Sequence, residues 1–228
     1  MQKALLYVAS LVVLLTAAFL VWSKAPRLEE PQMATTTAPV EMTVVENREE
    51  TDTYSIEIRY PQFGIEAVDA AVQAAVDGAV EAFKSYPVDE PPVDAIPKNE
   101  QVISFNSVYT GDRYASVGLL ISEYTGGAHP NSVIIGVNVD RTTGSELTLD
   151  DALALLGMSL REVADSTRVR LSERLGEAFF EDGAAATSEN YGTFLIDADE
   201  VTFVFNTYQV APYAAGPQLV SFPRATDN

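Results

Sequence analysis

The spacing of apolar residues changes along the chain, and each spacing predicts a different element. Apolar and polar residues alternate over residues 54–60, which predicts a half-buried strand that ends at Pro61. Over residues 65–83 the apolar positions recur every three or four residues, which predicts an amphipathic helix with an acidic outer face. The same spacing predicts a second long helix over residues 160–179.

The middle and the end of the chain are rich in the β-branched and aromatic residues that favour strands. A hairpin is expected where Gly111 and Asp112 separate two such runs, residues 102–110 and 114–124. Further strands are expected over residues 133–139, 193–196, 201–205 and 219–222. This order predicts an α+β fold, in which a single domain has a largely antiparallel sheet packed by two long helices.

At two places in the chain a serine or threonine precedes an acidic residue by three positions, which is the spacing of a helix capping box. Thr148 with Asp151 predicts the start of a short helix, and Ser159 with Glu162 predicts the start of the second long helix. Arginines are concentrated on that long helix. We expect them to pair with neighbouring acidic residues rather than to bind an anion.

The N-terminal region is apolar and uncharged over residues 4–23, long enough to cross a hydrocarbon core of ~30 Å. An uncleaved membrane anchor and a cleaved signal peptide both fit residues 1–24. Residues 25–50 are rich in proline and threonine, which is typical of a stalk, and residues 51–228 are expected to form the domain. We expect a single-pass protein of the cell membrane with its C-terminal domain outside the cytoplasm.

The net charge of −19 narrows the choice of partners. Nucleic acid and anionic lipid would be repelled, whereas a cationic protein would be attracted. The absence of cysteine excludes disulfides, thiolate metal sites and a cysteine nucleophile. No sequence pattern indicates a cofactor or a metal site.

The stretch from Glu123 to Asn131 holds the only histidine of the chain, His129, beside the adjacent glycines Gly126 and Gly127. Three roles are open for His129: shaping the turn by a hydrogen bond to a backbone carbonyl, binding a ligand or partner, and catalysis. No serine lies in a nucleophile-elbow motif, and a zinc site with one histidine would be uncommon. The candidate binding residues are Glu123, Tyr124, His129, Asn131, Tyr208 and Tyr213.

Five stretches of the sequence together resemble one known family. They are residues 54–61, 124–131, 138–144, 147–151 and 201–216. In these stretches the chain is similar to the RsiV-like extracytoplasmic domain, and the resemblance extends over about residues 51–223. That domain occurs in a lysozyme-sensing anti-sigma factor and in the peptidoglycan deacetylase PdaC, and is otherwise a domain of unknown function. The resemblance implies an α+β fold and a role at the cell envelope.

The resemblance also implies what this chain would lack. Only three residues precede the apolar stretch, so we expect no segment that holds a sigma factor, and we expect no catalytic deacetylase domain before Asn228. The sequence therefore predicts a membrane-tethered extracytoplasmic binding or sensor module. Its expected partner is a cationic protein such as lysozyme, or peptidoglycan as a cell-wall glycan. The alternatives are a cell-wall polymer hydrolase centred on His129, and a structural envelope domain that pairs with another protein.

Overall fold

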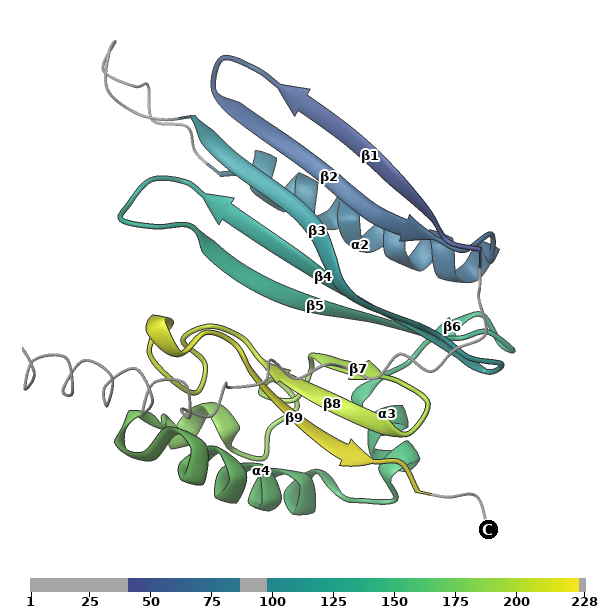
Figure 1. Cartoon of the computed structure of the whole chain (residues 1–228), viewed down its shortest axis with the longest axis vertical. Coiled ribbons are helices and arrows are strands. Elements are labelled where there is room, and N and C mark those ends of the chain that lie inside the picture. Colours follow the sequence, from purple (N-terminus) through teal and green to yellow (C-terminus); the bar gives the residue numbers. More distant parts are fainter. Residues whose placement is uncertain (1–40, 87–97, 226–228) are drawn as a thin grey trace, which may run out of the picture. The chain divides into compact units, whose positions relative to one another are not determined.

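The computed structural model describes residues 41–86 and 98–225, and this part of the chain forms two β-sheets (Figure 1). The six-stranded sheet has the order β1-β2-β3-β4-β5-β6. Its strands are β1 (Thr43–Glu50), β2 (Tyr54–Gln62), β3 (Asn99–Thr110), β4 (Tyr114–Tyr124), β5 (Asn131–Asp140) and β6 (Ser145–Glu146). The three-stranded sheet consists of β7 (Phe194–Ile196), β8 (Glu200–Phe205) and β9 (Gln218–Pro223).

Helix α2 (Glu66–Lys84) covers one face of the large sheet (Figure 1). It buries Val68, Val72 and Val76, which are four residues apart and therefore lie on one side of the helix. The helix lies between β2 and β3 in the chain, and these two strands are the parallel pair of an otherwise antiparallel sheet. A parallel pair needs such a crossover connection. The predicted helix, the strand before it and the hairpin after it are confirmed.

The second core lies between the small sheet and helices α3 (Leu149–Leu156) and α4 (Leu160–Leu175). The prediction of one sheet packed by two long helices was therefore wrong in its arrangement, because α2 and α4 each pack on a different sheet. The α+β class and the antiparallel character are confirmed. Periodicity identifies the apolar face of each element, but it does not identify the sheet on which that face packs.

Both predicted capping boxes are present. The Thr148 hydroxyl accepts from the Asp151 amide at the start of α3, and Ser159 and Glu162 repeat this at the start of α4. Helix α4 ends at Leu175 rather than at residue 179, and a short 3-10 helix follows.

The arginines of α4 divide between two roles. Arg168 pairs with Asp165 at 3.3 Å, as predicted, and Arg161 lies 4.0 Å from the same carboxylate. Arg170 and Arg174 instead donate to the carbonyl oxygens of Ser221 and Leu219 in β9, at 2.6 and 3.0 Å. These two side chains satisfy backbone acceptors at the outer edge of the small sheet, where an unpaired edge invites association.

A buried set of hydrogen bonds joins the two sheets. The Ile196 amide donates to Ser116 Oγ at 3.0 Å, and Ser116 Oγ donates to Asn138 Oδ1 at 2.7 Å. Asn138 Nδ2 then donates to the carbonyl oxygen of Phe194 at 2.8 Å. Ser116 and Asn138 lie side by side on β4 and β5. Their side chains bond the backbone amide and carbonyl groups at the edge of β7, as a neighbouring strand would do.

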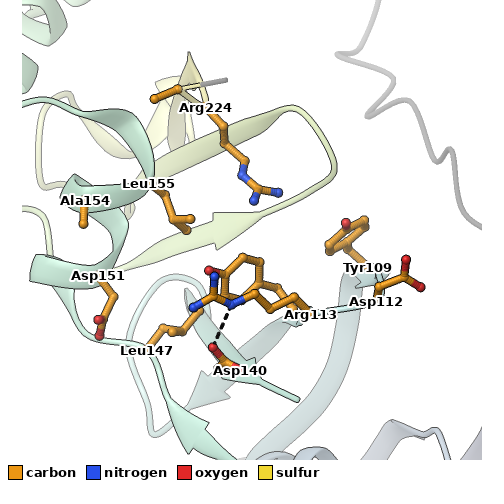
Figure 2. A pocket seen from close by; sticks show the side chains of 11 residues that line it. Tyr109, Asp112, Arg113, Asp140, Leu147, Asp151, Ala154, Leu155 and Arg224 are labelled. Carbon is orange, nitrogen blue, oxygen red and sulfur yellow. Dashed lines mark hydrogen bonds and ion pairs between the residues drawn. The ribbon is translucent and has the colours of Figure 1, made fainter. Parts of the chain in front are cut away.

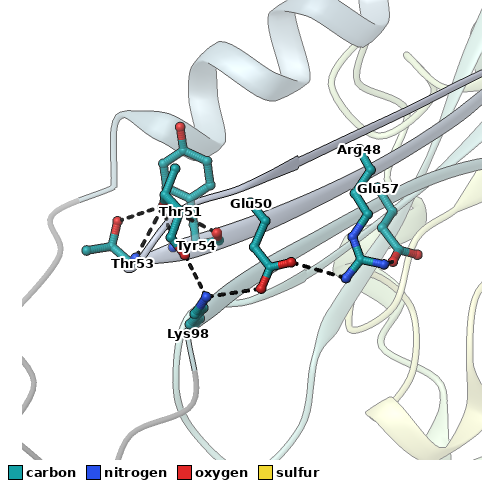
Figure 3. Close-up of polar contacts among 7 residues, drawn as sticks. All are labelled: Arg48, Glu50, Thr51, Thr53, Tyr54, Glu57 and Lys98. Carbon is teal, nitrogen blue, oxygen red and sulfur yellow. Dashed lines mark hydrogen bonds and ion pairs between the residues drawn. The ribbon is translucent and has the colours of Figure 1, made fainter.

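The N-terminal boundary of the domain differs from the prediction. Residues 43–50 are predicted to belong to the stalk, but they form β1, which pairs with β2 along its whole length. Figure 3 shows the hairpin end, where the Thr51 hydroxyl accepts from the Tyr54 amide at 3.0 Å and Lys98 Nζ donates to Thr51 O at 2.6 Å. The strand is almost entirely exposed and mostly polar, so it has no apolar alternation by which the sequence could indicate it.

The predicted membrane anchor at residues 4–23 and the rest of the stalk lie outside the described residues. Within residues 41–86 and 98–225, no helix combines the length and the apolar composition needed to span a bilayer.

Gly136 in β5 provides a test of the joint between the sheets. A Cβ atom at this position would overlap the carbonyl oxygen of Phe194, which is backbone and cannot turn aside. We expect Gly136→Ala to lower the free energy of unfolding by about 2–4 kcal/mol. Gly78 in α2 has no atom within 4 Å of such a Cβ, so Gly78→Ala should raise the free energy of unfolding by about 0.5–1 kcal/mol. Urea denaturation of both variants measures the difference, and equal effects would contradict the packing described.

Candidate functional site

The candidate site begins at the turn between β4 and β5. Gly126 and Gly127 have φ values of +100° and +106°, a backbone region open to glycine and strained for other residues. Tyr124 donates its hydroxyl to Gly127 O at 3.2 Å, and His129 Nδ1 lies 2.9 Å from Pro130 O. The hydrogen bond from His129 to a backbone carbonyl, one of the roles predicted for it, is therefore present.

Two tyrosines distant in sequence meet His129 at this turn. The Tyr213 ring stacks on the imidazole, with centroids 3.9 Å apart and an interplanar angle of 25°. Its hydroxyl donates to Pro130 O at 3.3 Å. Tyr208 OH lies 3.4 Å from His129 Nε2, and the two tyrosine rings are 5.6 Å apart. We call His129, Tyr208 and Tyr213 the aromatic cluster.

The contacts of His129 define its hydrogen-bonding state in the neutral form. A carbonyl oxygen only accepts, so Nδ1 carries the proton that it donates to Pro130 O. Nε2 of the neutral ring is then an acceptor, and Tyr208 donates its hydroxyl proton to it. The imidazole is thereby held in one orientation beneath the Tyr213 ring.

The segment after β8 is fixed firmly enough to hold both tyrosines in place. The Asn206 side chain accepts from the Ile134 amide at 2.7 Å and donates to Ile134 O at 3.0 Å, as a paired strand would. Gln209 accepts from the Asn206 amide and donates to Gly183 O and Asn190 O. The Tyr208 loop is therefore attached to β5 and to the segment before β7.

Tyr208 has an unusual backbone. Its φ of +70° makes it the one residue other than glycine with positive φ in the part of the chain that the structure describes. A bulky residue in this region is strained by about 1–3 kcal/mol, and such strain is concentrated at functional sites. The side chain is 53% exposed, and that of Tyr213 is 37% exposed. The strained backbone thus presents an aromatic ring to solvent instead of burying it.

The six predicted binding residues do not form one site. His129, Tyr208 and Tyr213 come together, and Tyr124 supports their turn. Glu123 instead accepts from Gln101 Nε2 at 2.8 Å, and Gln101 also donates to Ala79 O in α2.

The remaining predicted residues lie at the same end of the large sheet without joining the cluster. The Glu123 carboxylate also raises the pKa of Tyr86, whose hydroxyl lies 3.3 Å away. Asn131 is exposed and pairs with Glu123 in the ladder between β4 and β5. Sequence reasoning missed Asn206 and Gln209, which position Tyr208. The available signal was two amide residues that follow the end of a buried apolar strand, Asn206 directly and Gln209 three residues later.

The chemistry open to this surface is recognition by rings and hydroxyl groups. The described partners of His129 are a carbonyl oxygen and two tyrosines, whereas a catalytic triad would place a serine and a carboxylate beside it. Among residues 41–86 and 98–225 no group of three or more His, Cys, Asp or Glu residues is placed to hold a metal ion.

Two family models match different stretches of the chain. Residues 47–132 match the family model described as "Deacetylase PdaC", and residues 154–225 match the one described as "Protein of unknown function (DUF3298)". The chain is 24% identical over 177 residues to the peptidoglycan-N-acetylmuramic acid deacetylase PdaC of Bacillus subtilis (strain 168). This match covers 76% of the chain but 38% of that relative.

Two solved structures share the fold. A DUF3298 family member from Bacteroides fragilis NCTC 9343 has a TM-score of 0.57 and 18% identity, covering 80% of this chain and 90% of that chain. A DUF3298 family protein from Pseudomonas aeruginosa PAO1 has a TM-score of 0.53 and 16% identity, covering 82% and 91%. These matches show that the chain is similar to PdaC and DUF3298 proteins, and the solved structures share its mixed α+β fold.

The strain at Tyr208 can be measured by comparing two substitutions that both remove the ring. Glycine accepts the φ of +70° without strain, and alanine does not. We expect Tyr208→Gly to have a free energy of unfolding about 1 kcal/mol above that of Tyr208→Ala. Thermal or urea denaturation measures this difference. An alanine variant as stable as the glycine variant would show that the backbone at residue 208 is unstrained.

Proposed function

We propose that this chain is a binding module of the cell envelope that recognises cell-wall glycan through the aromatic cluster. The supporting observation is the exposed arrangement of the His129, Tyr208 and Tyr213 rings, which come from two loops and are held by hydrogen bonds. In this proposal a membrane tether at residues 4–23 holds the domain outside the cytoplasm, as an RsiV-like module would be held.

The chemistry of the cluster suits a sugar. A sugar ring has faces rich in C–H groups and edges that carry hydroxyl groups, whereas tyrosine combines an apolar ring with a polar tip. Tyrosine is also among the residues enriched at the energetic centre of binding surfaces. Rings fixed in place lose little conformational entropy on binding, which favours affinity.

The comparisons supply the context for a glycan ligand. The deacetylase PdaC is named for peptidoglycan N-acetylmuramic acid, and its family model matches residues 47–132, which include His129. This chain spans little more than a third of that protein. We therefore propose recognition of the wall polymer. We prefer binding to the hydrolase alternative because the described contacts of His129 include no serine, threonine or cysteine and no carboxylate.

Binding to purified peptidoglycan tests the proposal. Tyr213→Ala and Tyr208→Ala should each weaken co-sedimentation or the affinity for soluble muropeptides by at least about tenfold, since each removes an exposed ring worth ~1.4 kcal/mol or more. Tyr213→Phe keeps the ring and should retain most of the affinity. Tyr86→Ala is the matched control, because Tyr86 is 44% exposed but lies outside the cluster.

Three outcomes would count against glycan binding at the cluster. These are no binding by the parent chain, equal binding by all four variants, or loss of binding in Tyr86→Ala alone. Release of soluble fragments by the parent chain, abolished in His129→Ala, would instead support the hydrolase alternative.

A second candidate partner is a cationic protein such as a lysozyme, and the observation that favours it is the net charge of −19. The solvent-facing side of α2 carries Glu66, Asp77 and Glu81. We expect such binding to weaken steeply between about 0.05 and 0.3 M salt, because exposed charges are screened within about 10 Å at 0.1 M. Calorimetry with hen lysozyme at both salt concentrations measures it. Affinity independent of salt, or no binding at low salt, would exclude charge-driven recognition.

A further inference from the structure

An open cavity of about 580 Å³ lies at the opposite end of the large sheet from the aromatic cluster. Strand β4 runs from Tyr114 at the cavity to Tyr124 at the turn of the cluster. The lining comes from the turn between β3 and β4, the end of β5, helix α3 and the segment after β9 (Figure 2). Its volume lies within the range of small-molecule sites, about 300–1,000 Å³.

Arg224 is the most firmly positioned polar group of this cavity. Its Nη1 donates to Asp197 O and Ala198 O, both at 3.0 Å, and its backbone amide donates to Asp199 O at 2.7 Å. Figure 2 shows the guanidinium pointing into the cavity. In the part of the chain that the structure describes, no hydrogen bond involves its Nε or Nη2. The edge formed by these two nitrogens matches the two oxygens of a carboxylate.

A second guanidinium and an aromatic ring complete the positive side of the cavity. Arg113 and Arg224 both lie over the ring of the buried Tyr114, at 4.9 and 5.2 Å from its centroid. Arg113 is further held by Asp140, with Nε 3.1 Å from Oδ2. Both cations therefore lie against the same ring, although the Arg113 side chain remains 67% exposed.

The carboxylates at the cavity limit the charge of a ligand. Asp140 accepts from Arg113 and from the amides of Thr142 and Thr143, and these bonds lower its pKa although burial opposes the shift. Asp151 is occupied by its capping box with Thr148, whose backbone and hydroxyl donors lower the pKa of Asp151. Both groups therefore stay ionised and repel a dianion, while one negative charge can be balanced by Arg224.

We propose that this cavity binds the single carboxylate of a small ligand, such as the C-terminus of a short peptide, on the Nε–Nη2 edge of Arg224. Tyr109, Leu147, Ala154 and Leu155 line the same space and provide an apolar surface for short alkyl side chains. A phosphate dianion fits less well because of the three aspartates that line or border the cavity, Asp112, Asp140 and Asp151. This site is separate from the aromatic cluster and does not depend on it.

Two probes that differ in one group test the proposal. N-acetyl-alanyl-alanine carries a terminal carboxylate, and N-acetyl-alanyl-alaninamide has the same shape without the charge. NMR titration of the full chain should show saturable shifts around Arg113, Arg224 and α3 with the acid. The amide should bind at least about tenfold more weakly, because it leaves the guanidinium edge without a charged partner. Equal affinity for acid and amide, or no shifts with the acid, would overturn the proposal.

A matched pair of variants distinguishes recognition from folding defects. Ala154 is exposed on α3 and lines the cavity, so Ala154→Glu and Ala154→Gln introduce side chains of equal size at a site that tolerates substitution. The glutamate should weaken binding of the acid at least about tenfold by repulsion, and the glutamine should change it less than about threefold. Arg224→Lys keeps the charge but removes the planar edge, and should also weaken binding. Similar effects of Ala154→Glu and Ala154→Gln would contradict charge recognition.

The two sites are distinguishable in the same experiment. Tyr213→Ala should leave the affinity for N-acetyl-alanyl-alanine unchanged, because Tyr213 lies at the other end of the sheet. Loss of peptide binding in this variant would show that the cavity is not the site.

Discussion

Two buried side chains bond the backbone at the edge of β7, and the placement of the small sheet against the large sheet depends on these bonds. Ser116 and Asn138 take the positions that a neighbouring strand would take, so the small sheet joins the large sheet through hydrogen bonds to β4 and β5. Both residues are buried, at 2% and 3% exposure, and a lost partner would therefore leave a backbone group unpaired away from water. Gly136 makes room for this approach, because any side chain there would meet Phe194 O.

Side chains also bond the backbone at two other edges, those of β5 and β9. Asn206 pairs with Ile134 on β5, and Arg170 and Arg174 satisfy carbonyls of β9. Where side chains bond the backbone amide and carbonyl groups of an edge strand, these groups are not available to another chain, which opposes edge-to-edge association. They also fix the loops that follow, since Asn206 comes two residues before Tyr208. The bonds between Asn206 and β5 therefore both join the two sheets and position the aromatic cluster.

Both candidate sites lie where distant segments of the chain meet. The aromatic cluster combines the turn between β4 and β5 with the segment after β8, and the cavity combines the turn between β3 and β4 with the residue after β9. The two matched family regions, residues 47–132 and 154–225, contribute to each site. Neither region alone would form either site, so the two regions of the domain act together in the proposed binding.

The sequence by itself determined most of the elements. Alternation, helical spacing and the two capping boxes identified β2, α2, the β3–β4 hairpin and the starts of α3 and α4, because these signals are local. It also singled out His129, Tyr208 and Tyr213. Only the tertiary structure decided that α2 and α4 cover different sheets, that residues 43–50 form an edge strand, and that Glu123 faces Gln101 while the three rings meet. The tertiary structure also brings Arg113 and Arg224 to one cavity. All of these contacts join residues far apart in the chain, and no local sequence pattern encodes which of them will meet.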